Sequence, residues 1–375
     1  MTALRCLLLS AAVCSCLPRS AEGQSRDTLR IVFVGDLNFG RSLARNYIFE
    51  GRSAEILAGV GDRLRAADIA VGNLESILLE RGRHADTTNS PVFAGPQAEG
   101  IAILQDAGFD VLGNANNHAW DFGRAGLIEN LAHLDSAGIA HAGTGPTLGT
   151  AWRPVVVRAK DWTIAFFSLT AIFNYEDLTV VGHAAECCVA WADTLLAAQR
   201  FTAVRDSVGA DLVIAYVHAG MEYRPVPEPD VVIRFRALIR AGADAVIGHH
   251  PHVPQGIEYL DGKPIVYSLG NFVFKQGQAW TNRALWADLV LVPRSRESGI
   301  GNRESGADCR LPIADCRLSI TPLAVGYTPY FLSGADSAAV MAHLDSISGR
   351  IPARPRLPNP RPRRNVAHPR MTPGN

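Results

Sequence analysis

Short apolar runs typical of β-strands alternate along this chain with amphipathic stretches typical of helices. The first strand pattern ends in a turn at Gly35-Asp36, and a helical stretch follows it to about residue 64. We expect strands at residues 29–34, 69–71, 111–112, 163–169, 212–216, 245–247 and 265–268. We expect the main helices at residues 96–107, 123–137, 192–208 and 229–241. This alternation predicts a layered α/β domain. The sequence contains neither a G-x-G-x-x-G dinucleotide loop nor a G-x-x-x-x-G-K-[ST] phosphate loop.

The charge balance argues against a uniformly basic protein. The 375 residues contain 36 Lys+Arg and 36 Asp+Glu, and 47% of them are hydrophobic, which is enough for one large or two ordinary domains. Because nucleic-acid-binding domains usually carry a basic excess, we expect no nucleic-acid partner. Residues 350–375 hold seven Arg, seven Pro and no acid, so the first 349 residues have an acidic excess of seven. We expect this tail to be extended and unstructured.

The N-terminus has the outline of a secretory signal peptide over residues 1–23. Arg5 precedes an apolar run of about a dozen residues, and Ala21-Glu22-Gly23 presents small residues at the cleavage positions. This run is too short for a stable bilayer anchor. We therefore expect export to the periplasm or the extracellular space. Lipoprotein anchoring through Cys14 or Cys16 is the less favoured alternative, since the residues before each cysteine fit a lipobox poorly.

Residues 294–317 are expected to form a repetitive insertion in a surface loop. The sequence RESG occurs at 296–299 and 303–306, and ADCRL occurs at 307–311 and 314–318. Strand patterns flank the repeats at 287–293 and 318–325. Cys309 and Cys316 lie inside them, and Cys187 and Cys188 are adjacent, so we expect neither a disulfide framework nor a C-x-x-C metal site.

Polar residues cluster where the expected strands end. In open α/β sheets the carboxyl ends of the strands meet at one crevice, so segments spread over more than 200 residues can converge there. These residues are Asp36; Asn73 and Glu75; Asn116, Asn117 and His118; His218; and His249, His250 and His252.

The chemistry of this set favours divalent metal ions. Oxygen and imidazole ligands without thiolate suit Mn, Fe, Zn or Mg. Two such ions about 3.5–4 Å apart can activate a water molecule and neutralise charge on a phosphate-like transition state. Taken singly, Asp36 is typical of a turn or helix cap, His218 of a hydrogen-bonded core histidine, and Asn116-Asn117 of a turn. The three histidines at 249, 250 and 252 favour a metal or catalytic loop.

Six motifs in this sequence resemble the CapA family, the bacterial capsule-synthesis proteins linked to poly-γ-glutamate production. They run in the family's order from about residue 29 to 274. The family resembles calcineurin-like metallophosphoesterases, which implies a four-layer α/β/β/α sandwich over residues 28–345 with a two-metal centre at the strand ends. The motifs are GDLNFGR (35–41), GNLES (72–76), NANNHAWDFG (114–123), VHAGMEY (217–223), GHHPHVPQ (248–255) and YSLGNFVF (267–274).

The resemblance implies roles for particular residues. The bridging ligand is either Asn73 or Glu75, and the look of the family favours Glu75. The superfamily's usual His two residues after its first Asp is Asn38 here, which weakens one metal position. The implied metal ligands are Asp36, Glu75, Asn117, His218, His250 and His252.

The same resemblance assigns chemistry beside the metals. His118 would donate a proton to a leaving group or hold the substrate oxyanion, and Asp121 would orient it. Arg41, His249 and Asn271 are candidates for contact with substrate. A surface salt bridge is the alternative for Arg41, and a packing or turn role is the alternative for Asn271.

Two functions follow from these expectations. The first is a dinuclear metal-dependent hydrolase that cleaves a phosphoester or a glutamyl-polymer bond outside the cytoplasm. The second is a non-catalytic periplasmic factor that binds or guides an anionic capsule polymer during export or anchoring. In both cases membrane-bound capsule synthesis or export proteins are expected partners. A Ser-His-Asp hydrolase is disfavoured because the sequence has no G-x-S-x-G elbow.

Overall fold

The computed structural model describes residues 27–80, 82, 93–173, 188–293, 309–311 and 314–355. The predicted signal peptide, residues 294–308 of the predicted insertion and residues 356–375 of the predicted tail lie outside the described residues. None of the described helices has the length and apolar composition needed to span a lipid bilayer.

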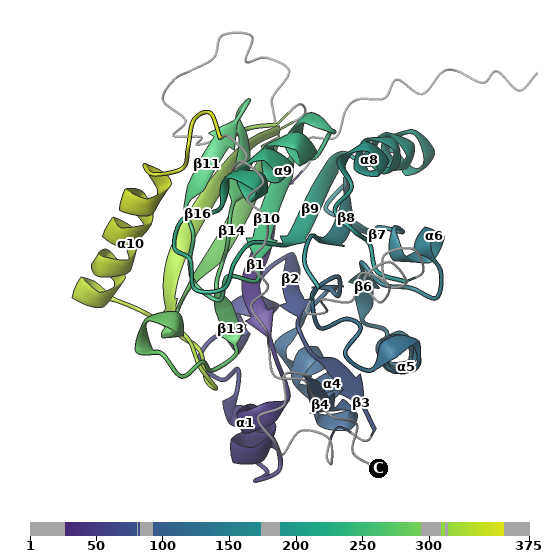
Figure 1. Cartoon of the computed structure of the whole chain (residues 1–375), viewed down its shortest axis with the longest axis vertical. Helices are drawn as coiled ribbons and strands as arrows, with labels where there is room; N and C mark the ends of the chain where they lie inside the picture. The colour runs from purple at the N-terminus through teal and green to yellow at the C-terminus, as the bar shows by residue number, and fades with distance from the viewer. Residues whose placement is uncertain are drawn as a thin grey trace, which may run out of the picture.

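Two large sheets form the centre of the domain (Figure 1). In the first sheet, β13 pairs with β1, and β17 pairs with β16, beside the main strand order. Strands β13, β1, β2, β5 and β6 are parallel, whereas β14 pairs antiparallel with both of its neighbours, β1 and β16. The main order is β15 (Cys309–Arg310), β16 (Ala314–Ala324), β14 (Arg283–Pro293), β1 (Leu29–Leu37), β2 (Ile69–Leu74), β5 (Val111–Gly113) and β6 (Ala140–Ala142), with β13 at Asn271–Val273 and β17 at Tyr330–Phe331.

The second sheet has four parallel central strands with an antiparallel strand at each edge. A separate pair of short parallel strands, β3 (Ile77–Leu79) and β4 (Ala94–Pro96), lies outside both sheets. The order of the second sheet is β11 (Ile257–Leu260), β12 (Lys263–Val266), β10 (Ala245–His249), β9 (Leu212–His218), β8 (Trp162–Thr170) and β7 (Val155–Ala159).

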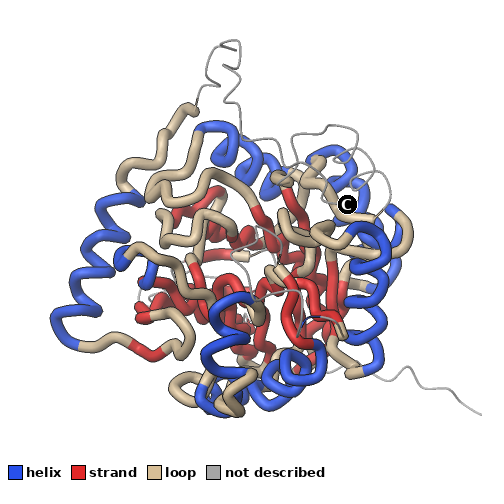
Figure 2. The backbone as a smooth tube through the Cα atoms, turned by 60° about the horizontal axis from the view of Figure 1, so that its bottom comes forward, coloured by secondary structure: helices blue, strands red, loops and turns tan. Residues whose placement is uncertain are grey.

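The helices surround the sheets, as Figure 2 shows with strands inside and helices outside. The longer ones are α4 (Gln97–Ala107), α5 (Gly123–Ser136), α8 (Thr194–Val208), α9 (Pro229–Arg240) and α10 (Gly334–Ser348). The shorter ones are α1 (Arg41–Leu43), a π-helical turn (Ala44–Ile48), two 3₁₀ turns (Ser53–Glu55 and Ala279–Asn282), α2 (Gly61–Arg65) and α6 (Leu148–Ala151).

Alternation of side chains along the strands builds the layers. In β1, Ile31 and Phe33 face the second sheet and pack in one core with Ile214 of β9. The intervening Val32 and Val34 face the other way and pack in the core that includes α4. Helices α8 and α9 cover the outer face of the second sheet in a third core. The order of layers is therefore helix, sheet, sheet, helix, which confirms the predicted α/β/β/α sandwich.

The strand ends that carry the motif residues are in register. In the first sheet, Asp36 pairs with Asn271 on one side and with Asn73 on the other. In the second sheet, His218 pairs with His249. The predicted turn at Gly35-Asp36 is wrong, because β1 continues to Leu37 between its neighbours β13 and β2. Because β1 pairs with two parallel neighbours, its functional side chain lies at the carboxyl end of the sheet, within the paired part of the strand.

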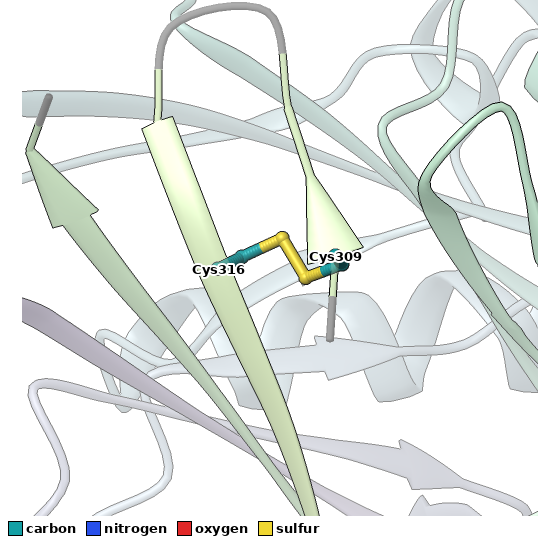
Figure 3. Close-up of a disulfide and its surroundings, with 2 residues drawn as sticks. All are labelled: Cys309 and Cys316. Atoms are coloured by element: carbon teal, nitrogen blue, oxygen red, sulfur yellow. A yellow bond between two sulfur atoms is a disulfide. The ribbon is translucent and has the colours of Figure 1, made fainter. Parts of the chain in front are cut away.

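Three expectations for the C-terminal part need correction. Strand β16 begins at Ala314 and pairs along its whole length with β14, so residues 314–317 belong to the sheet and not to the predicted loop. Cys309 pairs with Cys316 in a disulfide across β15 and β16 (Figure 3), although no disulfide framework was expected from the repeats. The first residues of the predicted unstructured tail also contact the domain, since Arg236 Nη1 donates a hydrogen bond to the Ala353 carbonyl (3.0 Å).

A side chain at position 35 would disrupt this arrangement. A Cβ on Gly35 would overlap the carbonyl oxygen of Gly270, which accepts a hydrogen bond from the Asp36 amide (3.1 Å). We expect Gly35→Ala to lower the free energy of unfolding by about 3 kcal/mol, because two backbones must separate. Urea unfolding followed by circular dichroism measures the change. Gly149→Ala is the control, since its Cβ would meet nothing closer than 3.8 Å, and equal midpoints for the two variants would contradict the expectation.

Candidate metal centre

The predicted ligands from the two sheets meet at one buried centre. Asp36 and Glu75 lie at the carboxyl ends of β1 and β2 in the first sheet. His218, His250 and His252 lie at or just after the carboxyl ends of β9 and β10 in the second sheet. All five side chains are buried. The sheets are also linked directly behind the centre, where the Tyr216 hydroxyl of β9 donates to the Val34 carbonyl of β1 (2.6 Å).

The carboxylate and imidazole atoms form two overlapping groups. One group consists of Glu75, His218 and His250, and the other of Asp36, Glu75 and His252. Within each group the ligand atoms all lie within 4.8 Å of one another. Glu75 is common to both groups, so its carboxylate lies where a ligand shared by two ions would be.

Glu75 has the chemistry that such a position needs. Both of its carboxylate oxygens are buried, and neither accepts a hydrogen bond from any residue that the structure describes. Burial and the nearby charge of Asp36 raise the pKa of Glu75 well above its ordinary value. A divalent cation between these groups would remove both penalties, because it supplies the missing partner and favours the ionised carboxylate. The residues present therefore fit a metal ion.

Asp36 is already paired, unlike Glu75. Its Oδ1 accepts a hydrogen bond from Asn73 Nδ2 (2.8 Å) and lies 3.1 Å from His249 Nδ1. Burial alone would raise the pKa of Asp36, but hydrogen bonds from His249 and His252 bring it well below the ordinary value. Asn73 is engaged in orienting Asp36, so of the two candidates for the bridging ligand the geometry favours Glu75.

The imidazoles are held in the form that binds metals. Burial lowers the pKa of His218 well below its ordinary value and, with the charge of His252, that of His250 to about 3. Neutral imidazole offers a nitrogen lone pair to a cation. Asn117 Oδ1 lies 2.7 Å from His218 Nε2, and His250 Nδ1 lies 3.1 Å from the same atom. The predicted ligands Asn117, His218 and His250 thus lie side by side.

The loop after β10 is strained where it presents its histidines. His250 has a φ of 98° and His252 has a φ of 58°, both in the left-handed region that non-glycine residues rarely adopt. Such conformations cost roughly 1–3 kcal/mol each and concentrate at functional sites. The strain directs both imidazoles toward Glu75.

His118 and Asp121 form a pair at the margin of the centre. His118 Nδ1 lies 2.7 Å from Asp121 Oδ2, and its Nε2 lies 3.9 Å from Glu75 Oε1. The other bond to Asp121 Oδ2 comes from the Phe93 amide (2.7 Å), and the Phe93 ring stacks on the His118 ring with 3.7 Å between centroids. The imidazole is therefore fixed with Nε2 toward the ligand groups, as the predicted role of His118 requires.

The three predicted substrate contacts take different places. His249 contacts Asp36, and its ring packs against Tyr216 with 4.1 Å between centroids. Asn271 Oδ1 lies 2.9 Å from His252 Nδ1. These two residues orient metal-ligand candidates in this structure. Arg41 is further out, with its guanidinium carbon 5.0 Å from the Phe93 ring centroid.

The sequence did not point to some residues that shape the site. Phe93 belongs to no motif, and nothing in its surroundings in the sequence indicates that it would stack on His118. Asn116 was recognised only as one of a cluster. Its Nδ2 donates to the Leu74 carbonyl (2.8 Å) and its Oδ1 accepts from the His118 amide (3.1 Å), so it holds the His118 loop against β2.

The sequence of this chain is similar to those of known capsule biosynthesis proteins. The chain is 32% identical over 261 residues to the PGA biosynthesis protein CapA of Bacillus subtilis (strain 168), covering 68% of this chain and 66% of that protein. It is 28% identical over 261 residues to the capsule biosynthesis protein CapA of Bacillus anthracis, covering 69% and 62%. The chain thus spans just under two thirds of the length of either relative.

Solved structures resemble it more distantly. Haemophilus influenzae NAD nucleotidase (NadN) shares 12% identity and a TM-score of 0.41, over 86% of this chain and 56% of that one. The family model "Bacterial capsule synthesis protein PGA_cap" matches residues 30–276, which include every candidate metal ligand. The chain therefore belongs to the PGA_cap family of bacterial capsule synthesis proteins.

Proposed function

We propose that this protein is an exported, metal-dependent hydrolase of the capsule-synthesis family that cleaves a phosphoester or a glutamyl-polymer bond. One observation carries the proposal: two buried ligand groups share the carboxylate of Glu75, which accepts no hydrogen bond from the described residues, and His118 Nε2 lies 3.9 Å from Glu75 Oε1. A binding protein has no need of a fixed proton donor beside such a pair of groups.

The residues divide between two cation positions. Asp36, Glu75 and His252 would hold one divalent ion, and Glu75, Asn117, His218 and His250 would hold the other. The nitrogen and oxygen donors suit Mn, Fe, Zn or Mg. When bound, such ions supply a nucleophilic water at neutral pH and neutralise charge that develops on the substrate.

His118 would provide the proton for the leaving group. Asp121 Oδ2 would accept a hydrogen bond from His118 Nδ1–H (2.7 Å), which leaves Nε2 directed at the centre. The Phe93 ring prevents the imidazole from rotating away. Proton transfer from Nε2 to the departing oxygen or nitrogen would then leave a neutral imidazole that Asp121 still orients.

Export is supported by two independent features. The first 23 residues have the pattern of a secretory signal, and the disulfide between Cys309 and Cys316 is of a kind that persists in oxidising compartments. Membrane-bound capsule synthesis or export proteins are the partners that we propose, since the named relatives act in capsule or PGA biosynthesis.

Removing the shared carboxylate should strongly weaken metal binding. We expect Glu75→Gln to weaken affinity for Mn²⁺ or Zn²⁺ by about 100-fold or more, since both positions lose a charged ligand. Elemental analysis and metal-dependent gain in Tm measure this. The metal-free variant should be at least as stable as the wild type, because an unpaired buried carboxyl is replaced by an amide. Glu55→Gln, an exposed residue, is the control, and full metal content in Glu75→Gln would refute the shared-ligand arrangement.

Removing the proton donor should separate catalysis from metal binding. We expect His118→Asn to lower kcat by about 10²–10⁴-fold while metal content stays at the wild-type level. Turnover of a p-nitrophenyl phosphodiester and of a γ-glutamyl anilide tests both bond classes. His141→Asn is the matched control, because His141 forms a surface pair with Asp135 (3.1 Å). Wild-type turnover in His118→Asn would exclude the role given to His118, and a metal-loaded wild type without any hydrolysis would favour a polymer-binding factor.

A further inference from the structure

A cavity of about 200 Å³ lies beside the metal centre and is lined by cationic side chains. Its wall includes Arg41 and Arg45 from the first turns after β1, and Lys275 just after β13. The described residues that line it include these three cations and no acidic side chain. Among the described residues, the lining of this cavity thus carries positive charge although the chain as a whole is neutral.

Asn38 contributes an unsatisfied donor to the same cavity. Its side chain is 3% exposed, and its Oδ1 accepts a hydrogen bond from the Gly40 amide (2.8 Å). This bond fixes the amide group, so Nδ2 is the atom left over. Asn38 Nδ2 is buried and makes no hydrogen bond to any residue that the structure describes. Because leaving a buried donor unpaired costs about 1–3 kcal/mol, the position is suited to an acceptor supplied by a ligand.

Aromatic rings connect this cavity to the candidate catalytic groups. Phe274 lines the cavity, and its ring lies edge-on to the His252 ring with 4.8 Å between centroids. On the other side, Arg41 lies over the Phe93 ring, which stacks on the ring of His118. The Phe274 ring therefore lies between the cavity and His252, and Arg41 with the Phe93 ring connects the cavity to His118.

We propose that this cavity, formed by Asn38, Arg41, Arg45 and Lys275, is a subsite for an oxyanion next to the reacting bond. The inference deepens the proposed function, on which it rests for the position of that bond. The ligand is a carboxylate or a phosphate, since both accept hydrogen bonds from an amide and from several cations at once. The substrate is accordingly a chain that carries negative charge on the unit adjoining the bond to be cleaved.

The subsite explains the departure from the metal motif at position 38. A histidine there would be a further metal ligand in the related superfamily. In this chain, Asn38 instead lies in the cavity wall, with its backbone amide bonded to the Val273 carbonyl of β13 (2.8 Å). The side-chain amide of Asn38 can donate a hydrogen bond to an anion. A histidine at this position would instead direct a nitrogen lone pair at a metal ion.

Binding measurements on metal-stripped protein test the subsite without relying on turnover. Isothermal titration calorimetry compares a γ-linked glutamate trimer, tripolyphosphate and the neutral γ-linked glutamine trimer. We expect the wild type to bind one or both anionic probes at least tenfold more tightly than the neutral one. Preference between the two anionic probes identifies carboxylate or phosphate as the natural group.

The variants are chosen so that folding does not decide the outcome. Lys275→Gln removes an exposed cation and Asn38→Leu removes the buried donor, and each should weaken binding of the preferred anion by about tenfold, the effect of one charge-assisted hydrogen bond. Lys275→Arg should bind as the wild type does. Arg200→Gln, an exposed cation on α8, is the charge-matched control and should change nothing.

The outcomes separate this inference from the proposed function. Equal affinity for the glutamine and glutamate trimers, or wild-type anion affinity in Lys275→Gln, would overturn the subsite even if the enzyme hydrolyses simple phosphodiesters. Weakened anion binding in both variants supports the subsite even if no hydrolysis is found with any substrate.

Discussion

The burial of two carboxyl groups in one centre is the constraint on which the rest of this structure depends. Asp36 and Glu75 are both fully buried, and the loss of hydration on burial is costly for any ionised group. The fold compensates for Asp36 with hydrogen bonds and nearby imidazoles, whereas no residue in the described part of the chain donates a hydrogen bond to the oxygens of Glu75. Only a proton or a cation can compensate the charge of the buried Glu75 carboxylate. Burial lowers the pKa of His218 and of His250, so these two imidazoles are better placed to share a cation than to supply a proton.

Each of the two sheets in the sandwich contributes part of the ligand set of this centre. The first sheet brings the carboxylates at the ends of β1 and β2, and the second brings imidazoles at the ends of β9 and β10. Neither sheet alone holds a complete ligand group, since each group combines residues from both. Their relative position is set by the core between the sheets and by the bond from Tyr216 to Val34. Substitutions in that core should therefore alter metal affinity as well as stability.

Much of this could be predicted from the sequence because buried parallel strands and the polar residues at their ends are local signals. The sequence predicts the strands that lead to Asp36, Glu75, His218 and the histidines of the last loop. Residues 314–317 were not placed in a strand, since their pattern repeats that of 307–310 and their pairing with β14 is a long-range contact. The disulfide between Cys309 and Cys316 was missed for the same reason, because the register of β15 and β16 brings the two residues together.

Within the site, the sequence distinguished residue types better than roles. His249 stands beside the ligand candidate His250 in its motif, whereas the motif of Asn271 holds no ligand candidate. Only the geometry shows that these two residues contact Asp36 and His252. Asn38 is the most informative case. From the motif alone it is a missing ligand that weakens the metal centre, whereas in the fold it is a buried donor in a cationic cavity. With Asn38 in place of the usual histidine, this position would contribute to recognition of negative charge instead of to metal coordination. Because the first 349 residues have an acidic excess, an anionic chain would be repelled elsewhere and would bind preferentially at the local cationic cavity.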